Sequence, residues 1–151
     1  MTKLIHTNRK AYRDYEVLES VECGVELKGS EVKSIRSGRI NLEDSYCRID
    51  NKEVILNSAH ISPYEQASYQ NVEPTRPRKL LLHRNQIIRL DTLLAQRGLT
   101  LVPLKVYFNE HGLVKIQVGL VKGKRLFDKR ETMKRREVDR QIRRALKHKE
   151  R

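Results

Sequence analysis

Charge is distributed unequally along this chain of 151 residues, and the imbalance limits how the chain can fold. Residues 122–151 hold fourteen Lys and Arg side chains against five Asp and Glu, a net charge of +9. The whole chain carries +13, so the first 121 residues carry only +4. A body of nearly balanced charge joined to a strongly basic segment is typical of a folded domain with a nucleic-acid-binding arm. We therefore expect a domain over residues 1–130 and a basic tail over residues 131–151.

A net charge of this size favours binding to a polyanion, because Lys and Arg side chains release condensed counterions whatever sequence is bound. The same charge steers and speeds the encounter with that partner. A tail that only increases solubility is the alternative that charge leaves open.

Nothing in the composition indicates a membrane or secreted protein. No apolar run approaches the roughly 18 residues needed to span a bilayer. Residues 1–13 lack the continuous apolar segment of a signal peptide. Cys23 and Cys47 form no Cys-x-x-Cys pair and are expected to be small core residues. We expect a cytoplasmic protein without membrane partners.

Alternating apolar residues predict two hairpins. Residues 102–108 and 114–120 alternate around a turn at 109–112, so one face should be buried and the other, with Lys105 and Lys115, exposed. Residues 45–50 and 53–61 predict the second hairpin. Residues 14–22 alternate imperfectly, and strand and helix both remain open there.

Two short helices are predicted from their ends. Ser30 as an N-cap and Gly38 beyond the last turn bound the first. Apolar residues at helical spacing over 84–97, followed by Gly98, indicate the second. Three prolines mark residues 62–79 as the longest irregular stretch.

Together these elements predict a mainly β fold with some α: a partly open, oligonucleotide-binding-type β-barrel with about three short helices and a basic C-terminal tail. A generic α+β sandwich fits nearly as well. In the tail, Val138, Ile142, Ala145 and Leu146 form an apolar stripe too narrow to hold a helix against the body. We expect the tail to be disordered in the free protein and helical on a polyanion.

Patterns of catalysis and metal binding are missing from the sequence. The histidines and cysteines never fall at metal-ligand spacing, and there is no glycine-rich phosphate-binding loop. We therefore expect no metal, no cofactor and no enzymatic activity, although a two-metal nuclease assembled only in three dimensions stays open. With aromatic residues at 5% and no tryptophan, recognition of folded RNA by backbone, shape and 2′-OH fits better than stacking on a single strand.

Six short segments occur in a fixed order: ECG at 22–24, GSEVKS at 29–34, RSGRINLEDSY at 36–46, AHISPYEQ at 59–66, RPRKLLL at 76–82 and KGKRLFDKR at 122–130. In this order they resemble the SsrA-binding protein family, also called small protein B, from about Asn8 to Leu146. Each segment alone is weak, and the six together are highly specific.

The resemblance implies a barrel of this type with added helices. It implies a monomer that binds the tRNA-like domain of transfer-messenger RNA one-to-one, near its D-loop and elbow. The complex would enter stalled ribosomes for trans-translation. There the protein would stand in for codon–anticodon pairing at the small-subunit decoding centre, with the tail in the empty mRNA channel. The family is not catalytic.

By the same resemblance, two sets of residues carry this function. Glu22 would accept hydrogen bonds from base amino groups or 2′-OH. Leu81 would pack against base or ribose, with a place in the core as its alternative. The residues expected to bind RNA are Asn8, Arg9, Lys10, Glu22, Lys33, Arg78, Lys79, Leu81 and His83. Those expected to act in ribosome accommodation are Asp128, Lys129, Arg130, Lys134, Arg135, Arg136, Arg140, Arg143 and Arg144.

Three positions depart from the family pattern. His83 stands where some relatives have Asn as a helix N-cap, so the helix should begin later or be capped by Asn85. Val138 replaces a Trp of many relatives, and Arg13 a His of some. A structural ribosomal protein whose tail threads rRNA is the competing function.

Overall fold

The computed structural model describes residues 2–64, 72–96, 98–124 and 126–149, with side chains in the last helix described over 135–147. Nine strands and four helices lie in these ranges. In chain order they are β1 (Lys3–Thr7), α1 (Arg9–Asp14), β2 (Tyr15–Val25), α2 (Gly29–Arg36), β3 (Ile40–Asn41), β4 (Tyr46–Asp50), β5 (Glu53–Asn57), β6 (His60–Ile61), β7 (Arg78–Leu81), α3 (Arg84–Leu94), β8 (Leu99–Phe108), β9 (Val114–Gly123) and α4 (Leu126–Lys149).

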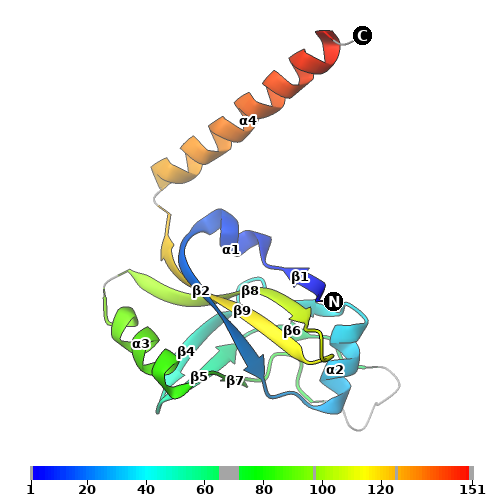
Figure 1. Ribbon diagram of the computed structural model, residues 1–151, viewed down its shortest axis with the longest axis vertical. Helices are drawn as coiled ribbons and strands as arrows, with labels where there is room; N and C mark the ends of the chain where they lie inside the picture. Colours follow the sequence, from blue (N-terminus) through cyan, green and yellow to red (C-terminus); the bar gives the residue numbers. More distant parts are fainter. Residues whose placement is uncertain (1, 65–71, 97, 125, 150–151) are drawn as a thin grey trace.

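Six antiparallel strands form a ring in the order β8-β4-β5-β7-β2-β9, and β9 pairs again with β8. Two contacts in this ring are short. β4 meets β8 only at Cys47 opposite Leu101, and β2 meets β7 only at two residue pairs. The ring is therefore a barrel that is only partly closed, which confirms the predicted fold class. α2 and α3 lie on opposite sides of it (Figure 1).

The barrel interior holds one continuous hydrophobic core. Val54, Leu56, Leu80 and Ile116 are buried there, together with both cysteines. Burial raises the pKa of the Cys23 thiol to about 12, so this thiol stays protonated and unreactive near neutral pH. The prediction that both cysteines are small core residues is confirmed.

The hairpin of β8 and β9 forms as predicted, but its apolar residues do not share one face. A register shift between Pro103 and Lys105 adds a residue to β8, and such a bulge reverses the alternation of side chains. Val106 and Phe108 face the main core. Val102 and Leu104 face a second cluster beneath α1, with Ala11 and Val121. The single buried face expected for β8 is therefore wrong.

The hairpin of β4 and β5 is also confirmed. Asn51 and Lys52 connect the strands with φ values of 51° and 62°, as a tight two-residue turn requires. The second strand is shorter than predicted, because Ser58 has a φ of 65° and turns the chain away. After Ala59, the strand β6 (His60–Ile61) pairs with β3 in a separate small sheet.

The helix ends differ from the predictions in their caps. α2 begins at Gly29 with Lys28 as N-cap, so the assignment of Ser30 is wrong; the Glu31 side chain accepts from the Lys28 N–H at 2.8 Å. Gly38 does follow the helix, with φ at 78°. α3 begins directly after His83, because the Gln86 side chain accepts from the His83 N–H at 3.0 Å. Neither a later start nor a cap by Asn85 occurs.

β1 and α1 have no counterpart among the elements expected from the sequence. β1 pairs with the second half of β8, and α1 covers the second apolar cluster. Residues 14–22, where strand and helix both remained open, lie almost entirely in the strand β2.

The basic tail is helical in this structure and projects from the end of β9 away from the barrel (Figure 1). α4 begins at Leu126, five residues before the expected tail. The side chains over 135–147 are exposed, including the stripe residues Val138, Ile142 and Leu146. Disorder of the tail in the free protein stays a prediction. None of the helices described here is long and apolar enough to cross a membrane.

Candidate nucleic-acid interface

A groove of about 390 Å³ lies where the outer faces of β2, β7 and β9 meet the start of α3. Gly24 of β2 stands opposite Leu81 of β7 on one side and Lys115 of β9 on the other. This register brings residues that are far apart in sequence into one surface. The groove is lined by Glu22, Gly24, Leu81, Leu82, His83, Gln86 and Lys115.

Three of the residues predicted to bind RNA meet in this groove. Glu22 is exposed because it occupies an outward position of the alternating strand β2. Leu81 is 47% exposed, which excludes its alternative place in the core. His83 joins them as the residue that connects β7 to α3.

Glu22 is held by a hydrogen bond that crosses the sheet. The Tyr107 hydroxyl on β8 donates to Oε2 of Glu22 on β2, with β9 between the two strands. Burial, followed by this contact, raises the pKa of Tyr107 well above its ordinary value. Tyr107 is therefore a neutral donor throughout the physiological range.

Lys79 lies beside the groove on the same outer face of β7. Its Nζ is 3.2 Å from Oε1 of Glu53 on the neighbouring strand, and both side chains are well exposed. An exposed pair of this kind is weak and easily exchanged for a phosphate. Lys33 lies elsewhere, on α2, with its Nζ 5.5 Å from the centre of the Tyr64 ring.

Arg78 does not face solvent, and the predicted direct contact with RNA is incompatible with its position. β7 alternates, so Arg78 points into the protein while Lys79 points out, and the Arg78 side chain is 1% exposed. Its Nε donates to Oε2 of Glu31 at 2.6 Å, and its two NH groups donate to the carbonyls of Ala59 and Pro74.

Glu31 is the centre of a buried network with two arginines. It is 3% exposed and accepts hydrogen bonds from Arg76, Arg78 and the Lys28 N–H. Burial alone would raise the pKa of Glu31, but the hydrogen bonds from these donors outweigh burial and hold it below its ordinary value. The network joins α2, β7 and the segment before β7.

The segment at the start of α1 holds three residues that were predicted to bind RNA, and their environments differ. Asn8 is 2% exposed and structural: its amide donates to the carbonyls of Leu42 and Pro103, and its Oδ1 caps α1. The predicted direct contact of Asn8 with RNA is therefore incompatible with its buried position. Lys10 is paired with Asp44. Arg9 is exposed.

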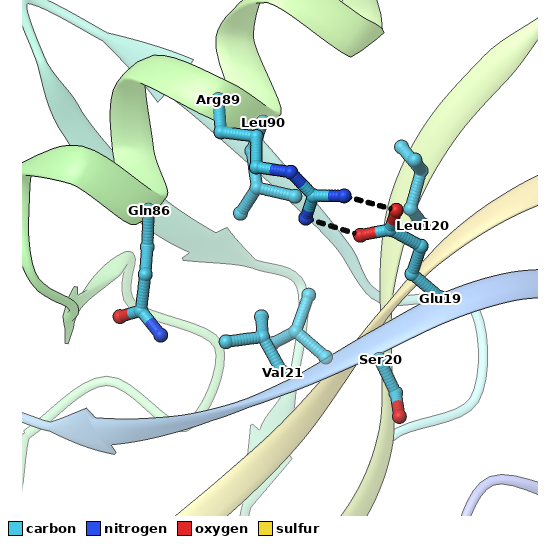
Figure 2. Close-up of a pocket in the computed structure, with 8 residues that line it drawn as sticks. Glu19, Ser20, Val21, Gln86, Arg89, Leu90 and Leu120 are labelled. Atoms are coloured by element: carbon cyan, nitrogen blue, oxygen red, sulfur yellow. Dashed lines mark hydrogen bonds and ion pairs between the residues drawn. The ribbon is translucent and has the colours of Figure 1, made fainter.

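A second depression, of about 210 Å³, adjoins the groove through the shared residue Gln86. Figure 2 shows Arg89 of α3 reaching across it to Glu19 of β2. The guanidinium donates to both carboxylate oxygens, at 2.5 and 2.6 Å. This bidentate pair links α3 to the barrel and so fixes the wall of the groove that carries His83 and Gln86.

The residues predicted for ribosome accommodation all belong to α4. Arg135, Arg136, Arg140, Arg143 and Arg144 are exposed. The helix also includes Asp128, Lys129, Arg130 and Lys134, whose side chains fall outside the described part of the structure.

Four residues that line the groove were absent from the predicted site: Gly24, Leu82, Gln86 and Lys115. Tyr107, which contacts Glu22 from outside the groove lining, was absent as well. Lys115 had a signal, since hairpin alternation placed it on the outer face. Tyr107 had no such signal, because only the sheet register brings it to Glu22. Gln86 had none either, because its contact with the His83 N–H depends on where the helix begins. Within the described ranges, no three His, Cys, Asp or Glu side chains cluster as metal ligands.

Comparison with known proteins gives consistent matches. The family model described as SmpB protein matches residues 5–148. The chain is 53% identical to the SsrA-binding protein of Moorella thermoacetica over 98% of this chain and 96% of that protein. It is 56% identical to the SsrA-binding protein of Carboxydothermus hydrogenoformans over 97% of each. The Enterococcus faecalis SsrA-binding protein is 55% identical over 97% of this chain and 94% of that one.

A solved structure is similar as well. A chain of the structure named "tmRNA-SmpB: a journey to the center of the bacterial ribosome" has a TM-score of 0.69 and 50% identity. The match covers 80% of this chain and 85% of that chain.

Proposed function

This chain belongs to the SmpB protein family, and from that membership we propose that it binds the tRNA-like domain of transfer-messenger RNA and delivers it to stalled ribosomes for trans-translation. The name of its relatives, SsrA-binding protein, supports the RNA partner. The similarity to a chain of the solved tmRNA-SmpB structure supports the ribosome as the second partner.

The observation that carries the proposal is the groove at Glu22. It combines an acceptor at Glu22, an exposed apolar side chain at Leu81 and a cation at Lys115. A nucleotide offers a matching set of groups: amino or hydroxyl donors, the face of a base or ribose, and a phosphate. The groove is thus suited to one nucleotide of a folded RNA rather than to a continuous strand.

The tail has a different part in the proposal. α4 spans 24 residues, about 36 Å at 1.5 Å per residue, and its described side chains touch no core. Five exposed arginines cover it. We place α4 in the empty mRNA channel and the body at the decoding centre, where it stands in for codon–anticodon pairing. The protein then acts as a cytoplasmic monomer, one per RNA, and as an RNA-binding factor rather than an enzyme.

Selective binding tests this proposal. The full chain is titrated with the tRNA-like domain of transfer-messenger RNA at several salt concentrations, with an elongator tRNA as competitor. We expect binding that persists at moderate salt and in excess tRNA, and that weakens roughly tenfold or more in Glu22→Ala. Equal affinity for both RNAs with a steep salt slope would show that net charge alone explains binding.

Gly24 offers an independent test of the groove. A Cβ at Gly24 would lie 3.3 Å from Cβ of Leu81, so Gly24→Ala should displace Leu81. The Cβ of Leu81 moves only with the backbone of β7, so we expect a loss of unfolding free energy of about 1–3 kcal/mol, together with a several-fold loss of RNA affinity. Gly29→Ala is the control, since no atom lies within 4 Å of its added methyl group. Equal RNA affinity of the two variants would contradict a contact at Leu81.

A further inference from the structure

In the described part of the chain, Glu22 lacks the cation partner that several acidic residues on the outer surface of the barrel have. Glu19 is paired with Arg89, Glu53 with Lys79, and Asp44 with Lys10. No cation pairs with Glu22 among the described residues, although the chain carries a net charge of +13. An unpaired carboxylate beside an RNA repels phosphate, so its presence in the groove needs a reason.

The one hydrogen bond that the described residues donate to the Glu22 carboxylate comes from a neutral group. The Tyr107 hydroxyl occupies Oε2, and Oε1 has no hydrogen-bond donor among the described residues. A phenol leaves the negative charge in place, whereas Lys or Arg would neutralise it. An ionised carboxylate only accepts hydrogen bonds, so Oε1 is free for an N–H or O–H donor of a ligand.

Tyr107 also determines where Oε1 points. A glutamate side chain has three rotatable bonds, and a groove residue without a partner would sample several rotamers. Tyr107 stands on β8, between Leu4 of β1 and Lys115 of β9, in the middle of a paired sheet. Its hydroxyl therefore fixes one oxygen of Glu22 from a rigid strand, while Glu22 itself lines the groove together with Leu81 and Lys115.

Building on the proposed function, we infer that Tyr107 is a positioning residue of the RNA site, which holds Glu22 so that its free oxygen accepts from a donor of one unstacked nucleotide. The donor is an exocyclic amino group of a base or a ribose 2′-OH. The apolar side of that nucleotide lies on Leu81, and Lys115 is placed for its phosphate. The groove then selects among nucleotides by their donors, while the basic surface supplies affinity without selection.

The test combines changes in the protein with changes in the RNA. The full chain, Tyr107→Phe, Glu22→Gln and the double variant are titrated with the tRNA-like domain. The same domain is also made with loop nucleotides that lack the exocyclic amino group, or with 2′-deoxy loop nucleotides. Tyr46→Phe is the control, since it also removes a phenol hydroxyl, but Tyr46 lies on β4, is 44% exposed and is not part of this groove.

We expect Tyr107→Phe and Glu22→Gln each to weaken binding roughly tenfold and the double variant to be no weaker than Glu22→Gln alone. The wild-type chain should discriminate against one of the two altered RNAs, which identifies the donor, and Tyr107→Phe should lose that discrimination. A merely structural role of Tyr107 would lower affinity for all RNAs equally.

Two outcomes overturn the inference: additive effects of the two substitutions on affinity, or discrimination between the RNAs that survives Tyr107→Phe. If the wild-type chain still prefers the tRNA-like domain over tRNA, the proposed function stands in both cases. A wild-type chain with no such preference overturns the proposed function itself. Should Tyr107→Phe fold poorly, Glu22→Ala decides, because alanine has no side-chain acceptor and a wild-type level of discrimination in that variant excludes Glu22 as the acceptor.

Discussion

A chain ending at Arg130 is expected to bind the tRNA-like domain with nearly wild-type selectivity and to lose tagging of stalled nascent chains. The buried core lies within the part of the chain that precedes α4, so the body should fold without the tail. The RNA groove is built from β2, β7, β9 and α3, with no contribution from α4. We therefore expect affinity to fall by less than about tenfold, mainly through lost charge, while tagging on stalled ribosomes falls to background.

A full-length control separates charge from helix in this experiment. Replacing the five exposed arginines of α4 by glutamine keeps a good helix former at each position and removes the charge. Replacing Ile142 by proline keeps the charge and breaks the helix. If the tail acts as a basic helix in the mRNA channel, both variants should tag poorly and bind RNA well. Loss of RNA binding on truncation would instead place the tail within the RNA site.

The parts of the fold that were predictable from sequence are those with local signals. Both hairpins were found because alternation and turn residues lie within about twenty positions of one another. The bulge in β8 was missed, since Pro103 and Lys105 give no local sign of an added residue. The family resemblance, now supported by matches over nearly the whole chain, supplied the barrel topology that alternation left open.

Some residues of the candidate site could likewise be predicted before the fold was known, and others could not. Glu22 and Leu81 were assigned by resemblance, and the sheet register brings them together. Arg78 and Lys79 looked equivalent as adjacent basic residues in an irregular stretch. Recognition that β7 begins at Arg78 would have placed them on opposite faces, because side chains alternate along a strand. Tyr107 lies 85 residues from Glu22, and only the folded sheet reveals their contact.

The buried position of Arg78 leads to the largest expected effect on stability. Arg78→Met keeps the apolar stem of the side chain but leaves Glu31 short of one partner and the Ala59 carbonyl without its donor. The Pro74 carbonyl loses one of two donors and keeps the Ile61 N–H. Removing one member of a buried ion pair typically costs about 3–5 kcal/mol, and we expect a loss of that size in urea unfolding followed by circular dichroism. The matched control is Lys79→Met, next in the same strand, where an exposed pair should cost about 1 kcal/mol or less.

Acid unfolding gives a second readout of the same network. Because the pKa of Glu31 is lowered in the folded protein, its ionised form stabilises the fold above the unfolded pKa of about 4.3. That contribution is lost as pH falls through the lower folded value. Glu31→Gln should therefore be less stable than wild type at neutral pH, and the difference should shrink in acid. A constant difference between the two chains from pH 7 to pH 3, or equal costs of Arg78→Met and Lys79→Met, would mean that packing rather than charge holds this region together.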